Sequence, residues 1–422
     1  MANDPARAQR VLLRVLLALI VLAAIAAVLI PAGRGWDFAN FYDTGRRAAA
    51  GQLQDIYNPS ALIGGGSPQG QMSFWGAPIS AWFYAPLSLF PPHVALILLK
   101  LVASLAFAAG LLLLYREMLP FASQNGPTSF WFAPVFALLI LLYQPFWTIY
   151  RVGGQTTPIV FLLLVLGLMC YLRDRIWAAA ICMLFVVLVK PAFLFVPAFL
   201  GLVSGRRFFL ALATVFLTTA AVSILLLGWP IHREFLEILR RGSGKPSPWP
   251  FNSSLYIVAD AFRNRAHSIP VPRSGGWFPD FLRTIMKLMV LGTFVFLGAQ
   301  SLGQEWTADR RRLFWYLLSV SFCLLISQVV WEHYLAVLFI PLSFLVALFP
   351  RMKFAERAHL GIILGLCVLQ NLVLVLYVRD HLPVSSFAGL LIVSILKAGP
   401  LLAYLGFLWF RRDFLFRQLA SA

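Results

Sequence analysis

Long apolar runs separated by short charged loops are the feature that most limits what this chain can fold into. The first run extends from Val11 to Ile30, and similar runs recur to the end, so that only 12% of the 422 residues are charged. A soluble domain carries about twice that share. A helix of ~20 apolar residues can cross a bilayer, and irregular backbone at that depth leaves polar groups unpaired. The sequence therefore predicts an all-α polytopic membrane protein with about 12 transmembrane helices.

The basic residues indicate how these helices are oriented. The net charge is +18, but Arg and Lys cluster at the ends of apolar runs, as the positive-inside rule expects. This pattern argues against a protein that binds nucleic acid. Arg7 and Arg10 place the N-terminus in the cytoplasm, and the basic stretch after residue 410 places the C-terminus there too. The short loops expected on the same side carry Arg116, Arg173, Arg206, Arg310, Arg351 and Arg411.

Two long segments, 33–91 and 229–279, then fall on the outer side of a single membrane-embedded domain that we predict to span 1–422. Long segments cross the membrane largely regardless of their charge. The second of these loops contains two pieces with helical character, 232–241 and 255–265. We therefore expect short helices outside the membrane as well as long ones within it.

The first external loop has two distinct parts. Phe38, Phe41, Tyr42 and Gly45 recur at helical spacing, which predicts a short helix lying on the membrane surface. Residues 74–92 are aromatic but are interrupted by several prolines, so they cannot form one regular helix. A broken segment at membrane depth must be buried in protein or line a cavity.

The unusual polar residues of the chain are expected on this outer side. Ionisable groups at or inside a membrane are costly and are candidates for function. Transfer of a group from a lipid phosphate needs cations or hydrogen-bond donors for the leaving phosphate and a base for the acceptor hydroxyl. Asp37 suits the base, and Tyr42 and Asp43 are further candidates in its loop. The candidate partners of the phosphate are Lys190, Arg151, His333, Asn252 and Gln155.

Several of these candidates also have plainer interpretations. Asp37 could cap a short helix. Asp43 could pair with Arg46 or Arg47, which follow it by about one helical turn. Lys190 could extend its charge to the membrane surface along its aliphatic stem.

The same holds for the polar residues nearer the middle and end of the chain. Arg151 could anchor a helix end, and His333 could be a satisfied interfacial histidine. We expect Glu332 to be solvated rather than catalytic. Lys100 could pack against a carbonyl, and Lys397 could mark a contact with lipid or a partner.

Taken together, the motifs of residues 35–345 resemble glycosyltransferase family 87, a group of bacterial membrane proteins that includes polyprenol-phosphate-mannose-dependent α-1,2-mannosyltransferases. The motifs occur in one order, and the order is more specific than any single motif. They are WDF and IYNP in the first loop, YAPLSLFP, GGQTTPIVFLLLVLG, VLVKPAFLFVPAFL followed by GRR, FNSS, and SQVVWEHYLAVLFIPL.

The resemblance implies a fold of the GT-C type, with the catalytic carboxylate in an external loop after the first span. It implies an inverting transfer from a polyprenyl-phosphate sugar to a glycolipid or lipid-linked glycan, on the periplasmic side of the bacterial inner membrane. The family's aspartate falls on Asp37, its GQ motif on Gln155, its KP motif on Lys190 and its late histidine on His333. Because some enzymes of the GT-C type use a paired carboxylate or a divalent metal, the resemblance keeps both open and makes Asp43 a second acidic candidate. We assign no metal or other cofactor, because no compact ligand cluster is visible and none of the four cysteines has CxxC spacing.

Two other classes of function remain at this point. A lipid or solute transporter would place its site at the midplane, between two related halves, but we find no internal repeat. A scaffold subunit of a cell-envelope assembly would tolerate neutral substitutions at Asp37 and Lys190.

Overall fold

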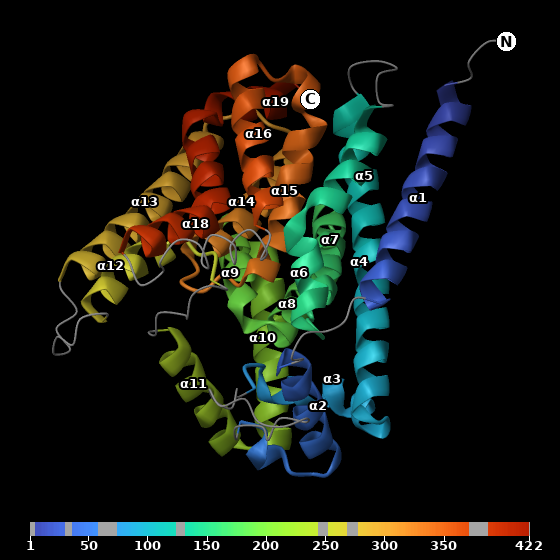
Figure 1. The fold of residues 1–422 in the computed structure, drawn as a ribbon, viewed down its shortest axis with the longest axis vertical. Coiled ribbons are helices and arrows are strands. Elements are labelled where there is room, and N and C mark those ends of the chain that lie inside the picture. Colours follow the sequence, from blue (N-terminus) through green and yellow to red (C-terminus); the bar gives the residue numbers. More distant parts are fainter. Residues whose placement is uncertain are drawn as a thin grey trace. The chain divides into compact units, whose positions relative to one another are not determined.

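The computed structural model describes residues 5–29, 36–57, 74–123, 131–243, 252–267, 277–370 and 387–421. These residues form 18 α-helices with short 3₁₀ segments between some of them (Figure 1). The β-structure within these ranges is one isolated bridge between Asn252 and Trp331. The all-α prediction is confirmed. Residues 64–71, whose glycine-rich composition predicts a flexible loop, lie outside the described residues.

Four of the described helices are long and apolar enough to cross a membrane. They are α4 (Pro92–Ser123), α10 (Arg206–Leu227), α13 (Trp277–Leu302) and α18 (Phe387–Phe410). A fifth candidate is the pair α5 (Phe132–Leu142) and α6 (Gln144–Val152), which is bent by 47° at its break. Such helices are those of an integral membrane protein.

Other apolar runs of the chain form shorter helices in the described residues. One run ends before Pro191, because a residue that precedes proline disfavours the helical conformation. The apolar segments of 10–17 residues are Thr157–Leu172, Ile176–Val189, Pro191–Val203 and Glu332–Ala347, together with Ala18–Leu29 at the end of α1 (Pro5–Leu29).

The chain divides into two compact units. Unit 1 comprises Met1–Arg14, Tyr115–Thr148 and Pro246–Ala422. Unit 2 comprises Val15–Leu114 and Ile149–Lys245. The single domain expected from the sequence stays a prediction, and each unit is described below by itself.

Unit 2 contains the first external loop. Its helix α2 (Trp36–Ala49) confirms the predicted short helix, and the proline-rich segment after it breaks into η2 (Pro78–Ser80), α3 (Ala81–Tyr84) and η3 (Ala85–Leu89), also as predicted. Helix α2 packs closely on α3 and η3. A Cβ at Gly45 would lie 2.2 Å from the Tyr84 carbonyl oxygen, so this approach requires glycine.

The rest of unit 2 is a set of apolar helices. Helices α7 (Thr157–Leu172) and α8 (Ile176–Val189) pack against each other, and α8 also packs on α10. The 3₁₀ segment η5 (Pro191–Leu194) and α9 (Phe195–Val203) follow α8. After α10 comes α11 (Trp229–Ser243), whose Phe235 stacks on Tyr57 beside the first loop. The helix predicted at 232–241 is thereby confirmed.

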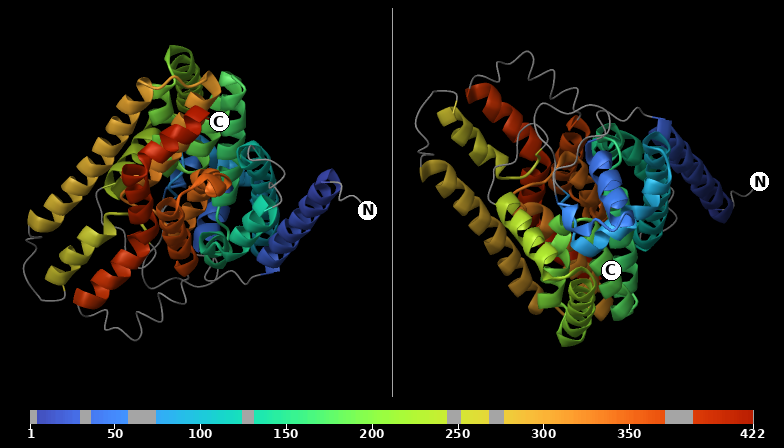
Figure 2. Two further views of the ribbon diagram at one scale, coloured as in Figure 1. Left: turned by 90° about the horizontal axis from the view of Figure 1, so that it is seen from above. Right: turned by 90° about the horizontal axis from the view of Figure 1, so that it is seen from below.

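Unit 1 is built around a buried helix. Every residue of α15 (Leu335–Ala347) is buried, and this helix packs on α14 (Ala308–Ile326) and α5. Helix α18 packs on α16 (Phe354–Leu369) and on α12 (Ile257–His267), the helix predicted at 255–265. Both views of Figure 2 show α12, α13 and α18 side by side.

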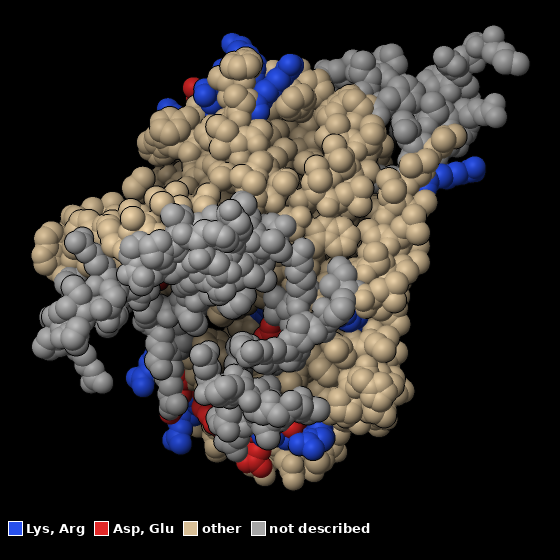
Figure 3. Space-filling model, viewed as in Figure 1, with Lys and Arg blue, Asp and Glu red and all other residues tan. Residues whose placement is uncertain are grey.

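Two arginine-bearing connections of unit 1 contact the same helix near the end of the chain. Arg310 donates to the Ala420 carbonyl of α19 (Arg412–Ser421) at 2.9 Å, and Arg351 donates to Gln418 of the same helix at 3.3 Å. Figure 3 shows Lys and Arg side chains gathered at this end. The loops that the sequence placed together by their arginines therefore do lie together within this unit.

Candidate functional site

Three of the predicted site residues form a connected chain in unit 2. Asp37 lies in the first turn of α2, Gln155 lies between α6 and α7, and Lys190 follows the last residue of α8. The Gln155 side-chain Nε2 donates to Asp37 Oδ2. Lys190 Nζ donates to Gln155 Oε1 at 3.0 Å. The glutamine amide thus joins the carboxylate and the ammonium group, using its donor on one side and its acceptor on the other.

Two local backbone features bring Gln155 to Asp37. Gly153 and Gly154 adopt φ values of 82° and 76°, which side chains other than glycine rarely adopt. A Cβ at Gly154 would also lie 2.5 Å from the Cβ of Phe38. The absence of a side chain at residue 154 therefore lets the loop touch α2 next to Asp37.

The position of Lys190 also follows from its sequence neighbour. Lys190 precedes Pro191 and is extended, with φ −145° and ψ 95°. Because proline disfavours the helical conformation in the preceding residue, α8 ends at Val189, and Lys190 lies outside the helices long enough to cross a membrane. Its side chain turns into the protein and is 8% exposed. The plainer interpretation, in which Lys190 extends its charge to the membrane surface, does not agree with this burial.

Burial changes the proton affinities of the two charged groups in opposite directions. Removal from water raises the pKa of Asp37, and the charge of Lys190 opposes this shift. Burial lowers the pKa of Lys190 to about 7, and the charge of Asp37 opposes that shift. Burial thus makes Asp37 a stronger base than an ordinary aspartate and brings the pKa of Lys190 close to neutrality.

The other predicted residues of unit 2 are tied into its framework. The Tyr42 hydroxyl donates to the Phe90 carbonyl at 2.9 Å, which fastens α2 to the end of the proline-rich segment. Asp43 forms ion pairs with Arg46 at 2.9 Å and with Arg47 at 3.1 Å. The plainer interpretation of Asp43 is thereby confirmed.

Two further basic residues of the same unit were singled out by the sequence. Arg151 lies in α6, and its side chain is outside the described part of the chain. Lys100 donates to the Val28 carbonyl at 3.2 Å, near the end of α1 (Pro5–Leu29). The predicted contact of Lys100 with a carbonyl is confirmed, and it supplies a donor to one of the last carbonyls of that helix.

Asn252 and His333 belong to unit 1. Asn252 is fully buried, and its Oδ1 accepts from the backbone amides of Ser254 and Val330, both at 3.0 Å. His333 is buried in η6 (Glu332–Tyr334), and its ring meets that of Tyr334 edge-on at 4.8 Å. The expected meeting of these two residues with Asp37 stays a prediction.

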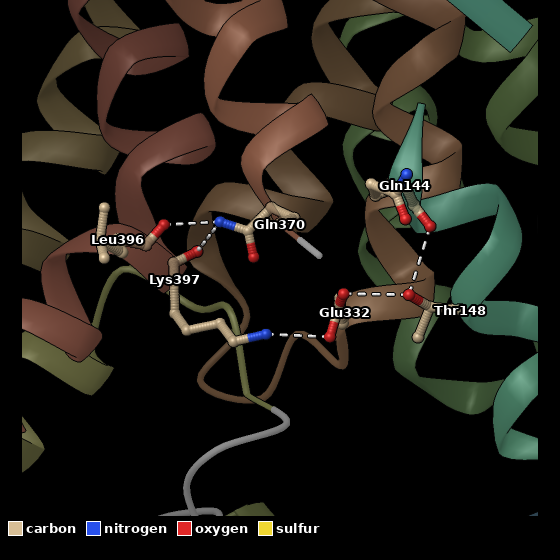
Figure 4. Close-up of polar contacts among 6 residues, drawn as sticks. All are labelled: Gln144, Thr148, Glu332, Gln370, Leu396 and Lys397. Atoms are coloured by element: carbon tan, nitrogen blue, oxygen red, sulfur yellow. Dashed lines mark hydrogen bonds and ion pairs between the residues drawn. The ribbon is translucent and has the colours of Figure 1, made fainter. Parts of the chain in front are cut away.

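The sequence missed an ion pair in unit 1. Glu332, which we expected to be solvated, is 2% exposed, and that expectation is wrong. Its Oε2 accepts from Lys397 Nζ at 2.9 Å, and its Oε1 accepts from the Thr148 hydroxyl at 2.9 Å (Figure 4). Lys397 is fully buried. Its charge is satisfied within the protein, where we had considered a contact with lipid or a partner. Opposite charges inside two apolar runs were the signal for this pair.

Within the described ranges, no three His, Cys, Asp or Glu side chains gather closely enough to hold a metal ion. Among the predicted site residues whose side chains are described, Lys190 in unit 2 and His333 in unit 1 can carry a positive charge and so could hold an anion.

Comparison with known proteins identifies the family. A search of curated proteins found no match. Residues 74–327 match the description of glycosyltransferase family 87. The match covers more than half of the chain and includes Gln155, Lys190 and Asn252, while Asp37 and His333 lie outside it. The chain therefore belongs to glycosyltransferase family 87.

Proposed function

We propose that this membrane glycosyltransferase moves a hexose, with mannose as the first candidate, from a polyprenyl-phosphate donor to a hydroxyl of a glycolipid or lipid-linked glycan. The observation that carries the proposal is the chain Asp37–Gln155–Lys190, which puts a carboxylate and a cation on one glutamine side chain. Its family membership supports the transferase activity. The identities of the donor and the acceptor are part of the proposal.

Asp37 is the general base in this proposal. Gln155 holds Asp37 Oδ2, and no described residue bonds to Oδ1. Oδ1 takes the proton of the acceptor hydroxyl as that oxygen attacks the anomeric carbon. The bond between this carbon and the phosphate oxygen breaks on the opposite face of the sugar, so the configuration inverts. The raised pKa of Asp37 makes it a stronger base than an ordinary aspartate.

Lys190 stabilises the leaving group. The phosphate oxygen departs with the bonding electrons, and a buried ammonium group opposes the charge that develops there more strongly than it would in water. Arg151, His333 and Asn252 are further proposed contacts of the donor. Tyr42 and Asp43 hold α2 in place beside Asp37.

In this proposal the protein has the GT-C fold, with about 12 spans in the plasma membrane of a bacterium. The arginine-bearing end of unit 1 faces the cytoplasm, as the positive-inside rule expects. The Asp37 site faces the periplasm. A lipid-linked donor and a lipid-linked acceptor can both reach it there by lateral diffusion in the membrane.

The test is transfer of labelled sugar from synthetic short-chain polyprenyl-phosphate donors, mannose first, to total membrane glycolipid. Purified wild-type protein is compared with Asp37→Asn. We expect product from the wild type and a transfer rate about 10²–10⁴-fold lower for the variant. Asp309→Asn is the matched control, because this carboxylate has 78% of its side chain exposed and lies in the other unit.

Wild-type activity in a folded Asp37→Asn protein would remove Asp37 as the base. Failure of the wild type with every donor sugar, in the presence of native lipid acceptors, would remove the proposed donor class. That result would favour the transporter or scaffold alternatives for this member of the family.

A further inference from the structure

The ion pair between Lys397 and Glu332 is the most deeply buried charged contact among the described residues. Lys397 is 0% exposed and Glu332 is 2% exposed, and their charged atoms are 2.9 Å apart. Lys397 lies in the middle of α18, one of the helices able to cross a membrane. Ionisable residues in such positions are rare, because each is costly to remove from water. Packing alone would be achieved more simply by apolar side chains.

The backbone around Lys397 is held by an unusual contact. Pro400 has no N–H group, so it cannot donate to the Leu396 carbonyl four residues earlier in α18. The side-chain amide of Gln370, which is 2% exposed, donates to that carbonyl. It also lies 3.3 Å from the Lys397 carbonyl (Figure 4). Gln370 thus replaces the missing helical donor at the turn from which Lys397 extends.

Glu332 is held on its other side by α6. The Thr148 hydroxyl donates to Glu332 Oε1 at 2.9 Å and lies 3.2 Å from the Gln144 carbonyl. Figure 4 shows Lys397 and Thr148 approaching the carboxylate from opposite sides. Both carboxylate oxygens therefore have partners, one from α18 and one from α6.

The segment that leads to Glu332 is held by contacts with other parts of unit 1. Residues 327–331 link α14 to η6 without helical structure. Asn252 holds the start of this segment: its Nδ2 donates to the Gln328 carbonyl at 3.2 Å, and its Oδ1 accepts from the Val330 amide. The backbone amide of Ser253 donates to the Val330 carbonyl at 2.6 Å. Glu332 holds the end of the segment, directly before His333. The segment is therefore fixed at both ends by side chains from other parts of unit 1.

We propose that Lys397 and Glu332 are positioning residues, whose ion pair fixes the turn at 331–334 so that His333 can meet the phosphate of the donor. The part that concerns the donor rests on the proposed function. The pair itself does not touch the reacting atoms. Its two ends come from segments 65 residues apart, so it sets the position of η6 relative to α18, which apolar contacts alone would leave less defined.

The experiment removes the charges without leaving one of them unpaired. The double variant Glu332→Gln/Lys397→Met keeps the side-chain volumes, and Glu332→Lys/Lys397→Glu reverses the pair. The matched control is Glu305→Gln/Lys353→Met, which makes the same chemical changes at two exposed positions of unit 1. Two quantities are measured on each purified protein: amide hydrogen exchange of residues 327–334 without donor, and kcat and KM for the short-chain donor.

We expect the neutral double variant to exchange about tenfold faster at 327–334 and to raise the donor KM about tenfold, a size typical of coupling between neighbouring residues. The kcat should change less than KM, because the lost contact binds the donor in its ground state. The reversed pair should recover most of both effects. In a His333→Gln background the neutral double variant should add little to KM, because the residue it positions is already gone.

Unchanged exchange at 327–334 in a folded neutral variant would overturn the proposal. An undiminished rise of KM in the His333→Gln background would overturn the route through His333. If the wild type transferred no sugar from any donor, the proposed function would fail, and hydrogen exchange alone would still decide whether the pair holds the turn.

Discussion

A Cβ on Gly154 would lie 2.5 Å from the Cβ of Phe38, so only glycine lets the loop that carries Gln155 touch helix α2 beside Asp37. We expect Gly154→Ala to destabilise the protein by about 2–4 kcal/mol, from a strained φ together with the clash. Gly51→Ala is the matched control, because Gly51 has φ 74° but a Cβ there would meet no described atom within 4 Å. Thermal unfolding of both variants separates the two causes. Equal losses at both positions would show that the close approach to Phe38 has no cost.

Gln155 is the second position to change, because its amide joins Asp37 to Lys190. Gln155→Leu puts an apolar side chain of similar size in place of the amide and removes both hydrogen bonds. We expect kcat to fall about 10–100-fold, since a base held loosely loses the orientation that transfer needs. The measurement is kcat for transfer, with the exposed Gln52→Leu as the control. Transfer at the wild-type rate in Gln155→Leu would contradict the linking role.

The pH dependence of transfer follows from the two shifted pKa values. Asp37 must be ionised, so activity is lost as the pH falls through its pKa, which burial raises above the ordinary value of about 4. Lys190 must be protonated, so activity is lost as the pH rises through its pKa of about 7. We therefore expect a bell-shaped profile of kcat/KM with its alkaline side near neutrality.

Lys190→Arg tests the assignment of the alkaline side. A guanidinium group stays protonated throughout this range, so the alkaline loss should move to higher pH, while the acid side stays controlled by Asp37. The measurement is kcat/KM across about pH 5–9 for both proteins. An alkaline side that stays in place would show that another group controls it.

Asn252 is expected to stabilise the fold, apart from its proposed contact with the donor. Asn252→Ala would leave the buried amides of Ser254 and Val330 without an acceptor, at a cost of about 1–3 kcal/mol for each. Asn252→Asp keeps the acceptor atom but replaces the Nδ2 donor to the Gln328 carbonyl, 3.2 Å away, with an oxygen, so it should recover only part of the stability. Chemical denaturation measures both. A donor KM that rises in a stable Asn252→Asp protein would add the proposed contact with the donor to its structural role.

The sequence predicted the parts of this molecule that depend on local pattern. The helix over α2, the broken segment after it, and the pairing of Asp43 with Arg46 and Arg47 all follow from spacing within a few residues. Asp37 and Lys190 were found because a charge in an apolar setting stands out against its neighbours. In the structure, the Gln155 side chain forms a hydrogen bond with each of them.

The parts that were missed depend on which segments pack together. Glu332 was expected in solvent because its neighbours in the chain are at a helix mouth, and its partner lies 65 residues away on α18. Four of the described helices, or five with the bent pair, are long and apolar enough to cross a membrane, so the expected number of about 12 spans stays a prediction.

The contact between Gln370 and the Leu396 carbonyl has a consequence for how this chain can change over time. Gln370 is needed there because Pro400 provides no donor. A substitution of Pro400 would return an N–H group to the helix, and the selective constraint on Gln370 would then relax. Positions 370 and 400 should therefore vary together among descendants of a common ancestor, although thirty residues of sequence separate them.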